Sequence, residues 1–215
     1  MSFHFQNRAE AGRLLAAKLE NCAGQAGLIV LGLPRGGVPV AFEVASKLKA
    51  PLDVFLVRKL GLPGHEELAL GAVASGGVCV FNDSLVKSCD IPRRVLDEIV
   101  QRERKELERR EQAYRRGPPP NLRGRTVILV DDGLATGASM RAAARAAREQ
   151  QPAQIIAAAP VAARETLEQL RREVDAAVCV HAPEDFSAVG EWYDDFKQTT
   201  DEEVRELLEK AAYFL

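Results

Sequence analysis

The sequence predicts an α/β fold, in which a doubly wound, mainly parallel sheet is flanked by helices. Two observations predict it. Short runs of consecutive apolar residues, typical of buried parallel strands, alternate with longer segments whose apolar residues recur at helical spacing. Several of the apolar runs also end in polar or glycine-rich loops. Because such loops gather at the carboxyl ends of parallel strands, we expect a functional site at that edge of the sheet.

Each expected element follows from its own local pattern. The expected strands are residues 28–33, 52–57, 70–74, 78–81, 126–130, 154–159 and 176–180. The expected helices are residues 8–20, 38–48, 92–116, 140–150, 162–174 and 201–213. Ser75-Gly76-Gly77 suits a hairpin turn between two of the strands. Thr136 or Ser139 is expected near the N-cap of helix 140–150, and Thr200 or Asp201 at the N-cap of the last helix.

Length and composition are those of one globular domain, which we expect to cover residues 1–215 with its core at about 28–160. The net charge of −2 comes from 29 basic and 31 acidic residues, which gives no general attraction to nucleic acid or to an anionic membrane. The four cysteines are scattered and are interpreted as reduced packing residues. No leader-like apolar segment opens the chain, so a cytoplasmic protein is expected.

The expected helix 92–116 is unusual because residues 101–111 are almost all charged. Pro92 suits its first turn. Charges of opposite sign alternate along it, and pairs such as Glu106 and Arg110 at spacing i,i+4 would support a solvated helix. A lid or a dimer arm projecting from the domain is the alternative. The alternating signs argue against an RNA-binding role.

The most informative segment follows the strand at residues 126–130. That strand ends at Asp131 and Asp132, and residues 133–139 then supply glycines, alanines and hydroxyl side chains before an alanine-rich helix. A small-residue loop leading into a helix N-terminus forms a phosphate cradle. The two carboxylates would repel that phosphate unless they face sugar hydroxyls or a metal, so a phosphorylated sugar satisfies both features. The alternative is a glycine-rich turn with two solvated acids.

This segment resembles the signature of type I phosphoribosyltransferases, which bind phosphoribosyl diphosphate (PRPP). The resemblance implies that Asp131 and Asp132 hold the ribose hydroxyls and that the following loop holds the 5′-phosphate. Many members have Thr where this chain has Ala135, which removes at most one hydroxyl contact. The PRPP-binding residues implied are Arg35, Gly36, Gly37, Asp131, Asp132, Gly133, Leu134, Ala135, Thr136, Gly137, Ala138 and Ser139.

Two further loops fit the resemblance. Arg35-Gly36-Gly37 after the first strand is similar to the family's pyrophosphate loop, which often carries a cis or strained peptide; a plain tight turn is the alternative. Residues 57–67 contain Arg58, Lys59 and His65 and are interpreted as a mobile loop that closes over PRPP. The expected catalytic residues are therefore Asp131, Asp132, Arg58, Lys59 and His65, although Lys59 and His65 also suit plain exposed loop positions.

The acceptor is the least determined part of the prediction. In this family the acceptor lies under a hood made from terminal segments, here residues 182–215, and Phe186, Trp192 and Tyr193 are the candidate acceptor contacts. The alternative is that these aromatic side chains anchor the last helix to the domain.

The resemblance implies transfer of the phosphoribosyl group of Mg-PRPP to a nitrogenous acceptor, with release of diphosphate. Mg²⁺ is the expected cofactor, touched by Asp131 or Asp132 at most through water. PRPP, a small-molecule acceptor and a second copy in a homodimer are the expected partners, without nucleic acid or membrane. The alternative function is a regulatory protein with the same fold that senses PRPP or a nucleotide without turnover.

Overall fold

Five parallel strands form the central sheet of the computed structural model, which describes residues 3–62, 65–89, 91–115 and 117–214 and no side chain of residues 65–68 or 83. In spatial order the strands are β2 (Leu52–Val54), β1 (Leu28–Gly32), β6 (Thr126–Val130), β7 (Gln154–Val161) and β8 (Ala176–His181). The chain moves outward from β1 to β2 on one side and from β6 to β8 on the other. The topological switch point therefore lies between β1 and β6, where such sheets place their ligands. The predicted fold class is confirmed.

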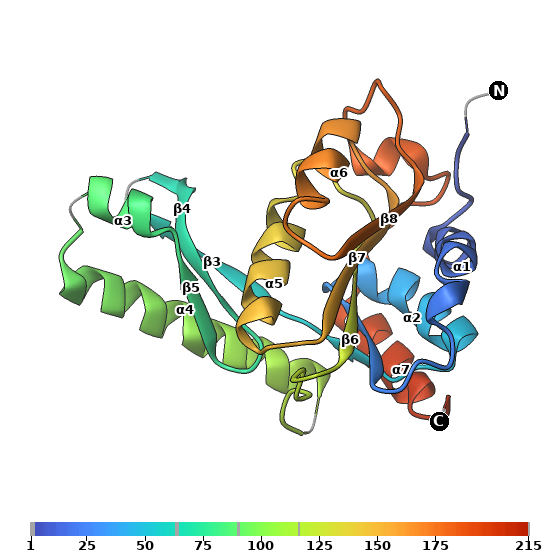
Figure 1. The fold of residues 1–215 in the computed structure, drawn as a ribbon, viewed down its shortest axis with the longest axis horizontal. Helices are drawn as coiled ribbons and strands as arrows, with labels where there is room; N and C mark the ends of the chain where they lie inside the picture. Colours follow the sequence, from blue (N-terminus) through green and yellow to red (C-terminus); the bar gives the residue numbers. More distant parts are fainter. Residues whose placement is uncertain (1–2, 63–64, 90, 116, 215) are drawn as a thin grey trace.

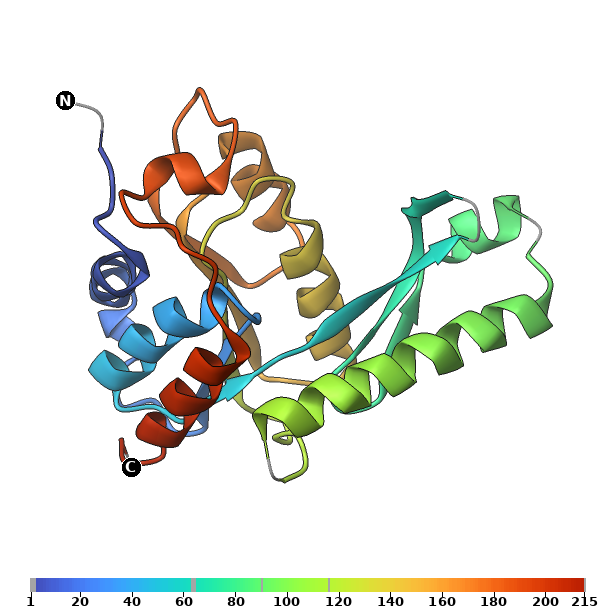
Figure 2. The same cartoon turned by 180° about the vertical axis from the view of Figure 1, so that it is seen from behind.

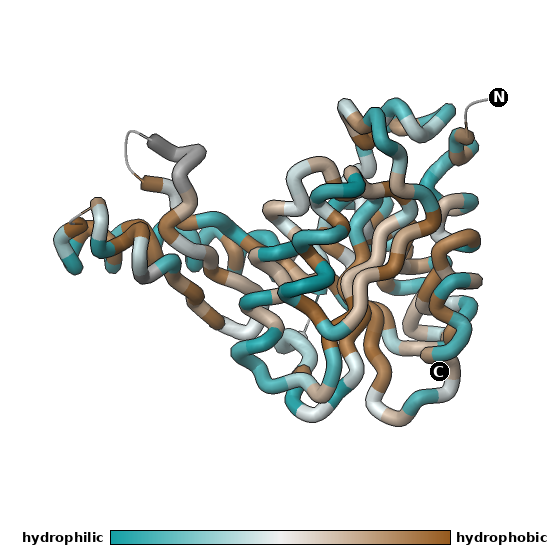
Figure 3. The backbone as a smooth tube through the Cα atoms, turned by 45° about the horizontal axis from the view of Figure 1, so that its top comes forward, coloured by the Kyte–Doolittle hydropathy of each residue, from teal (hydrophilic) through white to brown (hydrophobic). Residues whose placement is uncertain are grey.

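Helices cover both faces of this sheet (Figure 1). They are α1 (Arg8–Lys18), α2 (Gly37–Leu48), α5 (Ala138–Glu149), α6 (Arg164–Leu170) and α7 (Asp201–Ala211). Successive strand residues point to opposite faces: Val127 and Leu129 pack in the cluster that includes α5 and α6, whereas Ile128 and Val130 pack in the cluster with α1 and α2. Because both faces are covered, the central strands are continuous apolar runs, which Figure 3 shows in brown.

A second unit projects from the sheet as an arm (Figures 1 and 2). It consists of an antiparallel sheet of β3 (Val57–Leu62), β4 (His65–Ala74) and β5 (Val78–Phe81), followed by α3 (Asp83–Ser88) and the long helix α4 (Arg93–Tyr114). Leu60, Leu70 and Val73 pack against Ile99 of α4. The predicted charged helix is confirmed, and only its first half and Leu107 contribute buried apolar side chains.

Two predictions in this region are wrong. The expected strand 52–57 is divided into β2 and β3, which belong to different sheets. The expected mobile loop 57–67 is, in its described part, an antiparallel strand pair in which Arg58 lies opposite Val73 and Lys59 opposite Ala72. The glycines and cations suggested a loop locally, but pairing with a distant strand and packing on α4 override local composition. Pro63 and Gly64 lie outside the described residues.

Helix boundaries also differ from prediction in informative places. The residue before α5 is Gly137, with φ +64°, and neither Thr136 nor Ser139 is its N-cap. Thr200 does cap α7, since its side chain accepts a hydrogen bond from the Glu203 amide, as predicted. The helix expected at 162–174 is shorter, because regular helix ends at Leu170 and turns follow.

The two terminal segments meet beside the carboxyl ends of the strands. The Phe5 amide donates to the Trp192 carbonyl at 2.9 Å, and the Asp194 amide donates to the Phe5 carbonyl at 2.8 Å. Phe5 is fully buried against Tyr193 and Val161. The hood was predicted at residues 182–215. In the structure the first residues of the chain pair with residues 192–194 of that segment, whereas its last part, α7, packs against α2 and β2. Among the described helices, none combines the length and apolar character needed to cross a membrane.

Candidate functional site

The loops after β1 and β6 touch each other at the switch point. A Cβ atom added to Gly36 would lie 2.0 Å from Oδ2 of Asp132, and one added to Gly37 would lie 2.5 Å from the Val130 carbonyl oxygen. Only glycine permits this approach. The peptide bond between Pro34 and Arg35 is cis, as the family resemblance led us to expect. The structure thus places the predicted residues Arg35 to Gly37 against both predicted carboxylates.

Asp132 is held by a residue that the sequence analysis did not select. Both Nε and Nη2 of Arg8 lie 2.9 Å from Oδ2 of Asp132. The Arg8 guanidinium also stacks on Phe196, 4.0 Å from the ring centroid, and donates from Nη1 to the Lys197 carbonyl at 2.7 Å. Arg8 therefore links the N-terminal segment, the carboxylate pair and the hood. Its 124-residue separation from Asp132 explains why no local signal could reveal it.

The two adjacent carboxylates are in different electrostatic situations. Burial, and then the charge of Asp132, raise the pKa of Asp131 well above its usual value. Burial also raises the pKa of Asp132, but the charge and hydrogen bonds of Arg8 oppose this. Asp132 is thus a neutralised anchor, and Asp131 is the carboxyl with capacity for a ligand. One Asp131 oxygen, Oδ1, accepts the Asp132 amide at 2.9 Å.

The loop after the carboxylates presents backbone donors. In the described part of the chain, the amides of Ala135, Thr136 and Gly137 have no hydrogen-bond partner, and α5 begins directly afterwards. The loop itself is fixed, because Thr166 donates from Oγ1 to the Ala135 carbonyl at 2.6 Å. Leu134 is buried in the core, and its amide and carbonyl pair with Val161 and Ala163, so it offers no free group to a ligand. Three free amides at a helix N-terminus suit an anion such as phosphate.

Thr166 and Val189 are two further residues that the sequence analysis missed. A Cβ on Gly137 would lie 2.6 Å from Cγ2 of Thr166, and a Cβ on Gly133 would lie 2.3 Å from Cγ1 of Val189. Both neighbours come from elements distant in sequence. The glycines of this loop are therefore needed for close packing against α6 and the hood, as well as for backbone shape.

The three basic residues predicted as catalytic have different surroundings. Arg58 lies on β3 and donates to Glu103 of α4, with Nη2 at 2.6 Å and Nε at 2.9 Å. It lines a cavity together with Arg35. Lys59 is exposed on the same strand, where successive side chains point to opposite faces. The side chain of His65 lies outside the described part of the chain. Only Arg58 is therefore brought toward the predicted site.

The aromatic residues of the hood divide into two groups. Tyr193 is 6% exposed and donates from its hydroxyl to the Asp132 carbonyl at 2.5 Å. It anchors the hood to the carboxylate loop and to Phe5, and its cluster of buried residues contains none from the last helix. Burial raises the pKa of Tyr193 strongly. Phe186 and Trp192 are half-buried, and their nearly parallel rings (18°) have centroids 6.4 Å apart. The Trp192 indole N–H has no described partner. These two rings retain the capacity to contact a planar ligand.

The described side chains of this site offer few ligands to a metal ion. Within the described residues, no group of three His, Cys, Asp or Glu side chains has the arrangement of a metal site. Because Arg8 binds Asp132, Asp131 is the carboxylate that suits a hydrated Mg²⁺. This donor set fits an ion held mostly by ligand oxygens and water.

Fold and site together define a doubly wound α/β protein with a carboxylate pair and free backbone amides at its topological switch point. The family model of the phosphoribosyl transferase domain matches residues 4–194. The chain therefore belongs to the phosphoribosyl transferase family.

Two kinds of relative agree with this assignment. Proteins of Mycobacterium tuberculosis strains CDC 1551 and H37Rv, both named "Putative phosphoribosyl transferase", are 44% identical over 208 residues, which are 96% of this chain and 47% of each relative. The chain thus spans about half the length of these curated relatives. The crystal structure of TT1426 from Thermus thermophilus is 44% identical, with a TM-score of 0.87 over 97% of this chain and 99% of that one.

Proposed function

We propose that this protein transfers the phosphoribosyl group of Mg-PRPP to a nitrogenous acceptor and releases diphosphate. One observation carries the proposal: the free amides of residues 135–137 and the carboxyl group of Asp131 lie on one short loop. The amides and the N-terminus of α5 suit a 5′-phosphate, and Asp131 suits the ribose hydroxyls. An intact ribose 5-phosphate satisfies both parts of the loop.

The chemistry assigns separate tasks to the remaining residues. The bond between C1′ and the diphosphate oxygen breaks and its electron pair leaves with the diphosphate, while a nitrogen lone pair of the acceptor forms the new bond to C1′. Arg35 lies beside Gly36 in the loop that faces the carboxylates, where it would stabilise the leaving charge. Mg²⁺ would add charge neutralisation there, with Asp131 contacting it through water. Phe186 and Trp192 are the aromatic surfaces available to a planar acceptor.

Diphosphate release tests this proposal. Mg-PRPP is incubated with nucleobases, orotate, nicotinate and simple amines in turn. Release that depends on one acceptor is expected, and Asp131→Asn should abolish it. Asp97→Asn is the matched control, because Asp97 is an exposed acid on α4. PRPP affinity is measured for both variants by calorimetry. If Asp131→Asn binds PRPP as tightly as the unaltered chain does, the assignment of this loop is wrong.

A sensor that binds PRPP without turnover is the second candidate function. It is favoured by the ion pairs of Arg8 with Asp132 and of Arg58 with Glu103, which engage two cations close to the site. Calorimetric binding of PRPP without diphosphate release for any acceptor would support this alternative.

A further inference from the structure

A cavity of about 430 Å³ lies between the core and the arm. The side chains that matter for its chemistry are Arg35, Arg58, Arg109, Arg110, Tyr114 and Asp201. Its volume is in the range of small-molecule sites. Four guanidinium groups and a single carboxylate among the lining residues favour a ligand with several negative charges.

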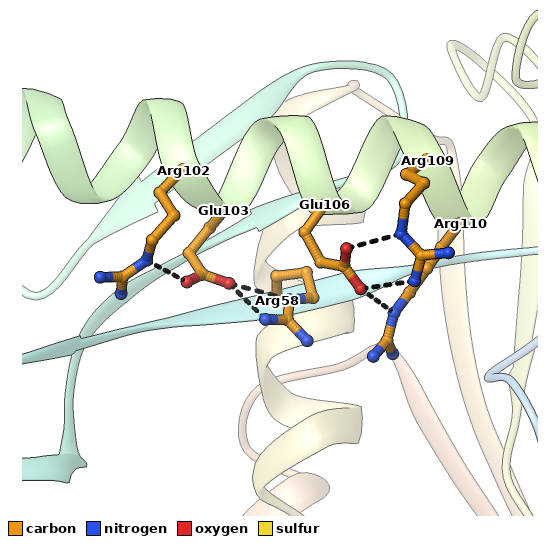
Figure 4. Close-up of polar contacts among 6 residues, drawn as sticks. All are labelled: Arg58, Arg102, Glu103, Glu106, Arg109 and Arg110. Atoms are coloured by element: carbon orange, nitrogen blue, oxygen red, sulfur yellow. Dashed lines mark hydrogen bonds and ion pairs between the residues drawn. The ribbon is translucent and has the colours of Figure 1, made fainter.

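The positive charge of this cavity is not cancelled by its neighbours. Glu106 accepts from Nε of Arg109 and Nε of Arg110, both at 2.8 Å (Figure 4). Glu103 is shared in the same way by Arg58 and Arg102. Glu106 thus compensates one of two cavity arginines, so this group keeps one positive charge in the cavity. Glu103 compensates Arg58, and its second partner, Arg102, is not among the lining residues.

The remaining pair in the cavity is loose. Arg35 lies 3.7 Å from Asp201, and both side chains are substantially exposed, at 38% and 53%. Asp201 also accepts the Tyr114 hydroxyl at 2.6 Å. An incoming anion could therefore replace Asp201 as the partner of Arg35, while Tyr114 continues to hold Asp201.

Arg35 connects this cavity to the carboxylate pair. It also lines a neighbouring space of about 320 Å³ together with Arg8, Gly36 and Asp132. A ligand could thus have its sugar at the carboxylates and its charged end among the arginines. Arg109 and Arg110 reach this position because α4 runs back from the arm to the core (Figure 2).

We propose that Arg109 and Arg110 of the inserted helix α4 are diphosphate-binding residues, and that this four-arginine cavity receives the diphosphate end of the substrate. The inference rests on the proposed function, since it assigns the four-arginine cavity as the binding site of the diphosphate leaving group. It also gives the charged helix a role that its sequence, with alternating charges, did not suggest. Planar guanidinium groups suit the phosphate oxygens through paired hydrogen bonds.

Titration of inorganic diphosphate into the full chain by calorimetry tests this assignment. Arg109→Gln combined with Arg110→Gln should weaken diphosphate binding at least about tenfold, because each arginine supplies charge-assisted hydrogen bonds. The matched control is Arg93→Gln with Arg94→Gln, which removes two charges from the same helix far from the cavity; Arg94 is 83% exposed and pairs with Glu98. Glu106→Gln should tighten diphosphate binding, because it frees both arginines.

A parallel titration with ribose 5-phosphate separates this inference from the proposed function. Ribose 5-phosphate probes the loop at residues 131–139, and its affinity should be unchanged in the Arg109 and Arg110 variant. Equal diphosphate binding by this variant and its control, or no diphosphate binding by the unaltered chain, overturns the inference. Arginine-dependent diphosphate binding without any ribose 5-phosphate binding would support Arg109 and Arg110 as diphosphate-binding residues but would reject the proposed function, and with it the assignment of the cavity to the substrate's leaving group. Circular dichroism confirms that every variant is folded.

Discussion

Substitution of Gly36 by alanine offers a sharp test of the site. Gly36 has φ −60° and ψ −32°, values that alanine adopts without strain. The added Cβ, however, would lie 2.0 Å from Oδ2 and 2.7 Å from Cγ of Asp132. Since Oδ2 is the oxygen that Arg8 holds with two contacts of 2.9 Å, the Asp132 carboxylate must move and its ion pair must weaken.

The expected loss follows from two overlapping effects. Overpacking a closely packed position costs about 1–3 kcal/mol, and losing a hydrogen bond to a charged group costs about 1.5–3 kcal/mol; Gly36 is only half-buried, but its added Cβ would meet the Asp132 carboxylate directly. One movement of Asp132 relieves the first effect and causes the second, so the two costs are not additive. We expect Gly36→Ala to lower the free energy of unfolding by about 2–3 kcal/mol, which lowers Tm by roughly 4–12 °C in a domain of this size. PRPP affinity should fall about tenfold or more, because the neighbouring Asp131 is displaced as well.

Thermal unfolding followed by circular dichroism, together with PRPP calorimetry, measures both effects. Gly117→Ala is the control, since no atom lies within 4 Å of a Cβ at that position. A double-mutant cycle with Asp132→Ala isolates the mechanism. Without the carboxylate, Gly36→Ala should cost less than about 0.5 kcal/mol. An equal cost of Gly36→Ala in both backgrounds would refute the reasoning.

Three further predictions concern the same site. Asp131→Asn should raise the free energy of unfolding at pH 7 by about 1 kcal/mol. Folding raises the pKa of Asp131, so this carboxyl destabilises the folded protein progressively as the pH rises above the pKa of the unfolded state, near 3.9. The gain should therefore vanish below that pH in thermal melts, and an equal difference at pH 3.5 and 7 would contradict this. Arg8→Gln should lower the free energy of unfolding, measured in urea, by about 3 kcal/mol. The loss should be the same at 0.1 and about 1 M NaCl, because the side chains of Arg8 and Asp132 are only 12% and 15% exposed; a loss that salt abolishes would indicate a solvated ion pair. Thr166→Val should cost about 1–2 kcal/mol and weaken ribose 5-phosphate binding by releasing the Ala135 carbonyl; unchanged affinity would show that other contacts hold the loop.

Local sequence patterns were sufficient to predict the central sheet and the loop that carries the two carboxylates. Strand β6, the acids Asp131 and Asp132, and the small residues before α5 are adjacent in the chain, so their order alone indicated a site at a strand end. Gly36 and Gly37 were selected for the same reason, and the structure places both against the carboxylates. Apolar runs buried on both faces also made the parallel sheet predictable.

Only the tertiary structure decided which residues surround the carboxylates and their loop. Arg8 meets Asp132 across 124 positions, and no periodicity or spacing records such a contact. Arg58 is part of a strand because β4 pairs with it, although its neighbours in sequence resemble a loop. The charged surface of α4 becomes a cavity wall because the helix returns to the core. The sequence by itself determined the sheet, the carboxylate pair and the small-residue loop before α5, since strand pattern and turn chemistry are local. The partners of those groups were decided by folding, because side chains far apart in the chain acquire a common environment only when the elements that carry them pack together.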